Sequence, residues 1–266
     1  TILEGYEKHY KNDGLTYLEL NGKKAEHDFA IEISREPCLH CDGKGYDDNT
    51  KEACQKCGGK GERPLFLVGK IDAVAQDKQG RVWLVEHKSF KNLPSEDFRW
   101  TNQQATLYTW VMPQIGFPKP AGVIWDYIRT KVPAKPELLK SGGLSKRKNI
   151  DTTRDVYLET IHEYGLDPND YQDILDYLEG SEDNFYRRIY LPTRENIIKP
   201  IVDDIINTAK EIYYLGETLK TRNLGRDCSF CAFKTICQTE IMGGDTEFVK
   251  RTEYRPSTYH VVAEEE

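Results

Sequence analysis

The stretch GKIDAVAQDKQGRVWLVEHKS (residues 69–89) contains two apolar segments that carry ionisable residues where a buried strand normally has none. The first segment includes Asp72, and the second, Val82-Trp83-Leu84-Val85, ends on Glu86-His87-Lys88. Ionised groups near a core are unfavourable unless they are paired or bind something. The stretch therefore predicts a buried hairpin whose charges have a function.

The residues Asp77-Lys78-Gln79-Gly80 separate the two predicted strands. Asp in the first position and Gly in the fourth suit a type I turn that closes a three-residue hairpin loop. Counting outward pairs residue 74 with 84 and residue 72 with 86. Asp72 and Glu86 would then face each other with Cβ atoms about 5 Å apart. Lys88 would share that face, and the side chain of His87 would point to the other.

Two carboxylates this close repel each other unless a cation lies between them. A hard divalent ion that prefers oxygen ligands fits such a pair, and Lys88 beside it would stabilise negative charge on a phosphate. The arrangement indicates phosphodiester hydrolysis by a metal-activated water. The alternative is an ordinary hairpin with a surface carboxylate–lysine pair, which contributes little to stability.

The seven cysteines fall into two groups whose short spacings favour metal binding over disulfides. Two copies of CxxCxGxG provide four thiolates that suit one tetrahedral Zn²⁺, namely Cys38, Cys41, Cys54 and Cys57. A separate C-x2-C-x5-C group, Cys228, Cys231 and Cys237, lacks an identified fourth ligand. It fits an iron–sulfur cluster or Zn²⁺ with a ligand from elsewhere. Metal-binding thiols predict a reducing, cytoplasmic location.

The chain of 266 residues is 38% hydrophobic and 30% charged, which suits one large domain with an insert. Its net charge of −7 provides no global basic signature, so contacts with DNA would have to be local. The sequence has no apolar run long enough to cross a bilayer. We expect a core made of residues 1–35 and 64–240, an insert over residues 36–63 and a tail over residues 241–266.

Hydrophobic periodicity predicts the secondary structure. The predicted strands cover residues 65–75, 81–87 and 121–130, with a further hairpin around Asn21-Gly22. The predicted helices cover residues 1–12, 97–112, 154–164, 168–179 and 193–222, and residues 131–153 are predicted to be a basic loop. Since no cap signal precedes the first helix, we expect a segment upstream of this chain.

The pattern D-x13-E-x-K on a hairpin resembles the PD-(D/E)xK nuclease superfamily, and most closely its RecB-like branch, which includes phage exonucleases and the CRISPR-associated exonuclease. The segment GKIDAV resembles the GxxDxV strand of that branch, and Gln104-Ala-Thr-Leu-Tyr108 resembles its QxxxY motif. The resemblance covers most of residues 15–240. It implies a restriction-endonuclease-like α/β fold, a mixed central sheet flanked by helices, here with a zinc-knuckle insert and a helical C-terminal part ending in a cysteine cluster.

The resemblance also implies roles for the residues of the hairpin. Asp72 and Glu86 would hold Mg²⁺ or Mn²⁺, the backbone carbonyl of His87 would be a further ligand, and Lys88 would be catalytic.

Three further parts of the chain take their meaning from the resemblance. Gln104 and Tyr108 would lie beside the site on one helix face, although plain helix packing is the alternative. The C-terminal cysteines would hold a 4Fe–4S cluster. A metal-binding His on an upstream helix is expected in this branch, and His9 and His27 are both poor matches for it.

Basic residues predict where DNA would bind, although a solvated loop is the alternative. The candidates are Lys140, Lys146, Arg147 and Lys148 in the basic loop, with Arg99 and Trp100 before the QxxxY motif. We therefore expect a deoxyribonuclease, in particular an exonuclease acting on DNA that is single-stranded or has ends. It would work with a helicase or recombination partner and without a membrane. The alternative is a catalytically impaired DNA-binding or scaffold subunit of a helicase–nuclease or CRISPR adaptation complex.

Overall fold

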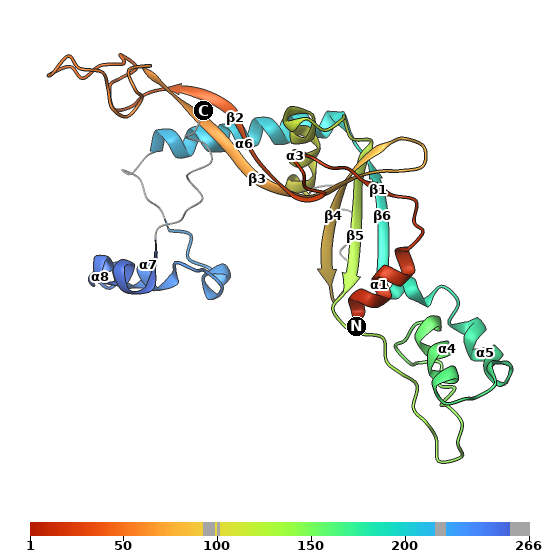
Figure 1. Ribbon diagram of the computed structural model, residues 1–266. Helices are drawn as coiled ribbons and strands as arrows, with labels where there is room; N and C mark the ends of the chain where they lie inside the picture. Colours follow the sequence, from red (N-terminus) through yellow and green to blue (C-terminus); the bar gives the residue numbers. More distant parts are fainter. Residues whose placement is uncertain (93–98, 100–101, 216–221, 256–266) are drawn as a thin grey trace. The chain divides into compact units, whose positions relative to one another are not determined.

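The computed structural model describes residues 1–92, 99, 102–215 and 222–255 (Figure 1). The chain divides into two compact units, Thr1–Ile31 with Leu67–Ile205 and Glu32–Phe66 with Ile206–Glu266. The predicted division into a core, an insert and a tail follows sequence signals and stays a prediction.

The first unit is built on a mixed β-sheet. The sheet has six strands in the described residues, in the order β1-β3-β4-β5-β6, and β2 pairs with β3. Strands β3 and β4 are antiparallel, β4 and β5 are parallel, and β5 and β6 are antiparallel. The strands are β1 (Thr16–Tyr17), β2 (Ala25–Pro37), β3 (Glu62–Gln76), β4 (Val82–Phe90), β5 (Gly122–Arg129) and β6 (Tyr186–Pro192).

The helices lie before, between and after these strands in the sequence. They are α1 (Ile2–Tyr10), α3 (Gln103–Val111), α4 (Arg154–Glu163), α5 (Gln172–Tyr177), α6 (Glu195–Leu215), α7 (Lys234–Ile241) and α8 (Thr246–Glu253). Short 3₁₀ turns lie at Met112–Ile115, Pro168–Tyr171, Ser181–Asn184 and Arg226–Ser229. No helix in the described ranges is both long and apolar enough to span a membrane. The mixed sheet flanked by helices confirms the predicted fold class.

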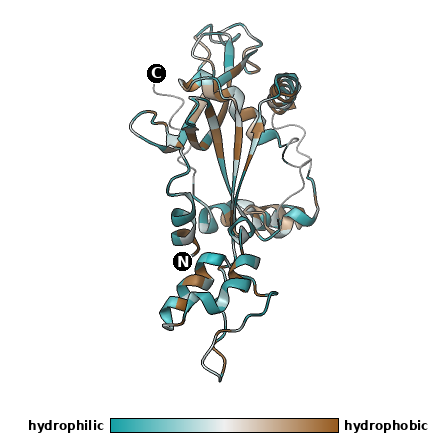
Figure 2. Cartoon of the chain, turned by 90° about the vertical axis from the view of Figure 1, so that its right-hand side faces the viewer, coloured by the Kyte–Doolittle hydropathy of each residue, from teal (hydrophilic) through white to brown (hydrophobic). Residues whose placement is uncertain are grey.

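The central strands are buried on both faces, and hydrophobic residues therefore run along them almost without interruption (Figure 2). One face of the sheet is packed by a cluster that includes Ala75, Val85 and Ile124. The opposite face buries Leu84 and Trp125. Glu86 on β4 and Asp126 on β5 are consequently surrounded by core atoms, which is an unusual environment for a carboxylate.

The predicted basic loop is more ordered than the sequence suggests. Leu144 is buried in a cluster with residues of α4 and α5. Its N–H donates to the hydroxyl of Tyr171 at 2.9 Å, and the hydroxyl of Tyr157 donates to the carbonyl oxygen of Ser145 at 3.1 Å. Residues 131–153 do form a loop, and these contacts fix its centre to a small helical module.

Three expectations were wrong or incomplete. Strand β6 was not predicted at all. The turn at Asn21-Gly22 is present, with φ values of 51° and 77°, but β1 before it pairs with β3 and not with β2. Helix α1 does have a cap signal, because Thr1 itself is the N-cap and forms a capping box with Glu4.

Parts of two predicted helices lie outside the described residues. These are residues 97–98 and 100–101 of the helix predicted over 97–112, and residues 216–221 of the one predicted over 193–222. Trp100 and residues 256–266 of the predicted tail lie outside them as well.

Candidate active site

The turn that begins at Asp77 sets the register of β3 against β4. Gly80 has a φ of 79°, and its N–H donates to the carbonyl oxygen of Asp77 at 2.9 Å. This left-handed residue closes the turn as predicted. The observed pair Val74↔Leu84 is the predicted one, so the register deduced from the sequence is confirmed.

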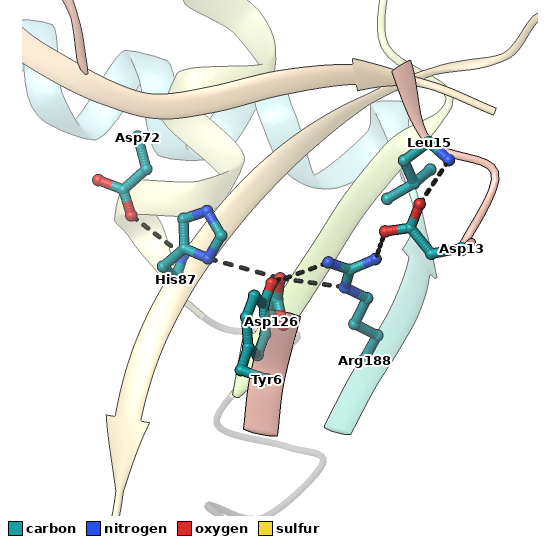
Figure 3. Close-up of polar contacts among 7 residues, drawn as sticks. All are labelled: Tyr6, Asp13, Leu15, Asp72, His87, Asp126 and Arg188. Atoms are coloured by element: carbon teal, nitrogen blue, oxygen red, sulfur yellow. Dashed lines mark hydrogen bonds and ion pairs between the residues drawn. The ribbon is translucent and has the colours of Figure 1, made fainter. Parts of the chain in front are cut away.

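The ladder between β3 and β4 ends at Ala73↔Val85, one pair before Asp72 and Glu86. At this point the N–H of His87 donates to Oδ2 of Asp72 at 3.0 Å (Figure 3). A side chain thus accepts the bond that a strand carbonyl would otherwise accept. Among the described residues, Oδ1 of Asp72 accepts no hydrogen bond. One oxygen of this carboxylate is therefore available to a ligand.

Glu86 is the most unusual side chain of the hairpin, since it is only 1% exposed. Its Oε1 accepts a bond from the ammonium of Lys88 at 2.5 Å, and its Oε2 has no partner within the described residues. Burial raises the pKa of Glu86, the charge of Asp72 raises it further, and Lys88 opposes both effects. A buried acceptor without a partner is unfavourable, so this oxygen needs an explanation.

The two unpartnered carboxylate oxygens, one on Asp72 and one on Glu86, fit a hard divalent cation. Such ions prefer oxygen ligands, and both candidate ligands here are carboxylate oxygens. A bound cation would satisfy Oε2 of Glu86 and would offset the repulsion between the two carboxylates. The donor set therefore suits Mg²⁺ or Mn²⁺.

Helix α3, which packs on β4 and β5, carries the predicted QxxxY pair. Nε2 of Gln104 donates to the hydroxyl of Tyr108 at 3.5 Å, so both side chains share one helix face. The Tyr108 ring meets Phe29 edge-on at 5.5 Å between ring centres. A Cβ added to Gly69 would lie 3.3 Å from the Tyr108 hydroxyl. Tyr108 therefore lies over β3 at Gly69, which precedes Asp72 by three residues.

Arg99 reaches the sheet face that carries Glu86 and Lys88. Burial raises the pKa of Tyr127, and the guanidinium of Arg99 acts against this shift. Tyr127 is the partner of Lys88 in the parallel ladder of β4 and β5. A candidate DNA-binding residue thus lies one strand away from the candidate catalytic lysine.

The four basic residues of the predicted DNA-binding loop differ in their surroundings. The ammonium groups of Lys146 and Lys148 each lie 5.1 Å from the ring centre of a tyrosine in the α4–α5 module. Lys140 and Arg147 are exposed. The first two therefore stabilise their own module as cation–π partners, and a role of the loop in DNA binding stays a prediction.

The four cysteines of the insert, Cys38, Cys41, Cys54 and Cys57, are all buried, with sulfur atoms within 4.8 Å of one another. The Cys38–Cys54 and Cys41–Cys57 sulfur distances are 4.0 and 3.8 Å. Sulfurs held about 2.3 Å from one tetrahedral ion would lie about 3.8 Å apart. The predicted grouping of these residues is observed, and its spacing fits a single metal ion.

Glycines explain the repeated CxxCxGxG pattern. The N–H groups of Gly45 and Gly61 donate to the sulfurs of Cys41 and Cys57, both at 3.3 Å. A Cβ on Gly45 would lie 2.4 Å from the carbonyl oxygen of Gly59, and the equivalent contact for Gly61 would be 2.5 Å. Both glycines also have a positive φ. No other residue fits these positions while the amides point at the sulfurs.

The C-terminal cysteines are arranged differently. Cys228 and Cys237 are half-buried and Cys231 is exposed. In the part of the chain that the structure describes, the insert cysteines are the only group of three or more His, Cys, Asp or Glu side chains close enough to share one ion. The sulfurs of Cys228, Cys231 and Cys237 therefore do not converge, and a cluster held by them stays a proposal.

The two upstream histidines, His9 and His27, pack against aromatic rings. His9 lies against the rings of Tyr10 and Tyr186. His27 is 3% exposed and meets Phe117 edge-on, and burial lowers its pKa. Neither contact is one that a metal ligand requires.

The sequence analysis did not single out Asp126, which is fully buried on β5. Its carboxylate is contacted by Tyr6, by Arg188 and by the imidazole of His87 (Figure 3). The signal was available, because a lone Asp in the apolar strand "GVIWDYIR" is unusual for the same reason as Asp72.

Comparisons with known proteins were made by sequence and by structure. The sequence profile of the PD-(D/E)XK nuclease superfamily matches residues 18–238. A search of curated proteins found no match. The crystal structure of SSO0001 aligns with a TM-score of 0.33 and 12% identity, over 89% of this chain and 66% of that one. The chain thus spans slightly less than two thirds of that structure, and a similarity this low carries no argument about function.

Proposed function

Because the chain belongs to the PD-(D/E)XK nuclease superfamily, we propose that it is a metal-dependent deoxyribonuclease that hydrolyses phosphodiester bonds at the β3–β4 hairpin. The observation that carries this proposal is Oε2 of Glu86, which is buried, has no partner among the described residues and lies near the charge of Asp72. The presence of this oxygen supports a site made to receive a cation.

In this proposal each residue of the hairpin has a separate task. Asp72 and Glu86 hold the ion through their free oxygens, with the backbone carbonyl of His87 as a further ligand. A bound Mg²⁺ or Mn²⁺ supplies an activated water and neutralises charge on the phosphate. Lys88 emerges on the same strand face as Glu86, so its ammonium stabilises the negative charge that develops on the phosphate oxygens.

We further propose that the chain is an exonuclease of the RecB-like branch acting on DNA that is single-stranded or has ends. The GxxDxV and QxxxY segments support this finer assignment. Gln104 and Tyr108 would contact DNA or orient Lys88. The nearby Arg99 would contact the phosphate backbone, a function also proposed for Trp100 and the loop residues Lys140, Lys146, Arg147 and Lys148.

For the two cysteine groups we propose different metals. The sulfur spacing of Cys38, Cys41, Cys54 and Cys57 supports a zinc knuckle, because a multi-iron cluster holds its thiolates farther apart. The resemblance supports a 4Fe–4S cluster at Cys228, Cys231 and Cys237, with a fourth ligand outside this group. Both metals suit a cytoplasmic protein, and a helicase or recombination protein is the proposed partner.

The test is cleavage of end-labelled single-stranded and double-stranded DNA in Mn²⁺, by the wild-type chain and by the Asp72→Ala variant. We expect cleavage by the wild type and none by the variant. The Asp77→Asn variant is the matched control, because it changes a carboxylate of the same hairpin at its other end. Absence of wild-type cleavage, or equal cleavage by Asp72→Ala, would overturn the proposed function and favour a DNA-binding or scaffold subunit.

Two further measurements test the finer assignments. An exonuclease should degrade linear DNA and leave covalently closed circular DNA intact, whereas nicking of the circle would identify an endonuclease. Metal analysis of anaerobically purified protein should find zinc and iron together, and zinc without iron would refute the cluster at Cys228.

A further inference from the structure

Asp126 is a fully buried carboxylate at the centre of a polar cluster on the sheet face opposite Glu86. Its Oδ2 accepts bonds from the hydroxyl of Tyr6 and, at 3.0 Å, from Nε of Arg188. The same oxygen lies 3.5 Å from Nδ1 of His87 (Figure 3). These contacts come from α1, β6 and β4, so Asp126 connects three elements.

The cluster is held firmly on the side away from His87. Arg188 is 6% exposed, and it also pairs with Asp13 and donates to the Tyr6 hydroxyl at 2.8 Å. The pKa of Tyr6 is raised, mainly by burial and also by Asp126, so its hydroxyl stays protonated and can donate. The side chain of Asp126 therefore has little freedom to move.

His87 is the only one of these residues on the hairpin that carries the proposed metal site. It pairs with Asp126 in the parallel ladder, and Asp126 pairs with Arg188 in the next ladder. The three side chains therefore lie in a row across one sheet face. The backbone N–H of His87 donates to Asp72, whereas its imidazole contacts Asp126. His87 therefore contacts Asp72 through its backbone and Asp126, on the opposite sheet face, through its side chain.

We propose that Asp126 is a positioning residue for the metal site, acting through the imidazole of His87 on the peptide that orients Asp72. The inference rests on the proposed function. In this role Asp126 is neither a metal ligand nor a group that touches DNA, since it is buried behind the strand. It keeps in place the His87 peptide, which lies just beyond the last pair of the β3–β4 ladder.

The need for such a device follows from the divergence of β3 from β4. The last pair of that ladder is Ala73↔Val85, so the backbone of β3 no longer fixes the peptide of His87. On that side, only the Asp72 carboxylate accepts its N–H. A restraint on the imidazole from Asp126 then limits rotation of the residue whose N–H and carbonyl both serve the site. Residues that orient metal ligands in this way commonly affect metal affinity or activity 10- to 100-fold.

The test is a double-mutant cycle with His87→Ala, Asp126→Asn and the double variant. It is read as Mn²⁺ affinity in calorimetry without DNA, and as cleavage rate against Mn²⁺ concentration and against DNA concentration. Each single variant should raise the Mn²⁺ concentration for half-maximal rate about 10-fold. KM for DNA should stay unchanged, because both side chains point away from the proposed catalytic face. The double variant should be no worse than the worse single variant, because the two residues act on one path.

Two additional variants separate positioning from folding. Asp126→Asn leaves Arg188 with one carboxylate fewer and can lower stability, whereas His87 is 39% exposed and His87→Ala leaves the buried cluster intact. His87→Asn, whose amide nitrogen can take the place of Nδ1, should restore the Mn²⁺ dependence. Asp77→Asn, at the turn of the same hairpin, should lower stability without changing that dependence.

The outcomes distinguish this inference from the proposed function. If the wild-type chain neither binds Mn²⁺ in calorimetry nor cleaves DNA, the proposed function fails. If it does both, but His87→Ala keeps the wild-type Mn²⁺ dependence, or the two single effects multiply in the double variant, the positioning role is wrong.

Discussion

The two candidate metal sites of this chain, the sulfur site of the insert and the oxygen site of the β3–β4 hairpin, are built on opposite principles. In the sulfur site four buried thiols converge, and glycine amides point at their sulfurs. In the oxygen site two carboxylates beside a lysine each contribute one oxygen that has no partner within the described ranges. The first arrangement provides four ligands, as in structural metal sites. The second provides only two side-chain ligands, so a bound ion would keep positions for substrate and water.

The difference also lies in where each site gets its geometry. In the sulfur site, the four thiols and the two glycine amides that donate to their sulfurs all lie within residues 38–61. The oxygen site depends on the register of β3 against β4 and on a buried cluster from α1, β5 and β6. Loss of the metal from the sulfur site should therefore unfold only the surrounding residues. The geometry of the oxygen site should instead change when residues far away in the sequence are substituted.

The largest effect is expected for the sulfur site. Cys54→Ser removes one of four ligands, so the ion should be lost and residues 36–63 should unfold locally. Zinc contributes about 10–16 kcal/mol to the folding of small zinc-binding peptides, and even a fraction of this exceeds typical mutational effects. Zinc content and limited proteolysis of the insert are the measurements.

The matched control for this variant is Cys228→Ser, which removes a cysteine from the group whose sulfurs do not converge. It should leave the zinc content and the protease resistance of the insert unchanged. A Cys54→Ser protein that kept its zinc would show that the ion is not held by all four thiols.

The next largest effect concerns the oxygen site. Lys88→Gln should lower kcat about 10²- to 10³-fold, the usual result of removing a charge that stabilises the transition state. The Mn²⁺ dependence should change little, since the carboxylates remain. Lys60→Gln removes an equivalent charge from the insert and should leave kcat unchanged. Equal losses in both variants would mean that net charge, and not position, is responsible.

A smaller effect of opposite sign is expected for Glu86→Gln in the metal-free protein. Burial raises the pKa of this carboxyl, so its ionised form opposes folding when no cation is present. A neutral amide should stabilise the metal-free protein by about 1 kcal/mol and abolish the stabilisation by Mn²⁺. Thermal unfolding with and without Mn²⁺ measures both, and the exposed Glu19→Gln should do neither. A lower melting temperature for metal-free Glu86→Gln would contradict this account.

The sequence contains the local part of this picture. The turn beginning at Asp77 predicts the register of the two strands, and this register predicts that Asp72 lies opposite Glu86. The CxxCxGxG repeats likewise predict four converging thiols. In both cases the information lies within about 20 residues, where turn chemistry and spacing leave little freedom.

The missed features are non-local. Strand β6 was not predicted because Arg187 and Arg188 interrupt its apolar pattern, although Arg188 is buried beside Asp126 on β5, Asp13 and Tyr6. The position of Asp126 in an apolar strand is unusual in the sequence alone, but its contacts are known only once its partners from α1 and β6 are placed. Tertiary pairing of this kind overrides strand propensity, and no single segment reveals it.

The smallest effect tests whether the sulfur site is anchored independently of its metal. Glu36, on β2 just before the first cysteine, accepts bonds from Ser34 at 2.5 Å, Tyr214 at 2.6 Å and Lys210 at 3.0 Å. These donors lower its pKa to about 2. Because the pKa is depressed in the folded state, this stabilisation is present above the unfolded value of about 4.3 and is lost as pH falls toward 2.

Glu36→Gln should therefore lower the melting temperature at pH 7 and remove the part of the acid sensitivity that arises between about pH 4.3 and 2. The measurement is thermal unfolding as a function of pH, with the zinc content followed in parallel. Glu32→Gln is the matched control, because Glu32 lies on the same strand but pairs with an exposed Arg35 and should contribute less. If Glu36→Gln instead lost its zinc at neutral pH, the insert would not hold its ion on its own, and the contrast between a local sulfur site and a distributed oxygen site would be wrong.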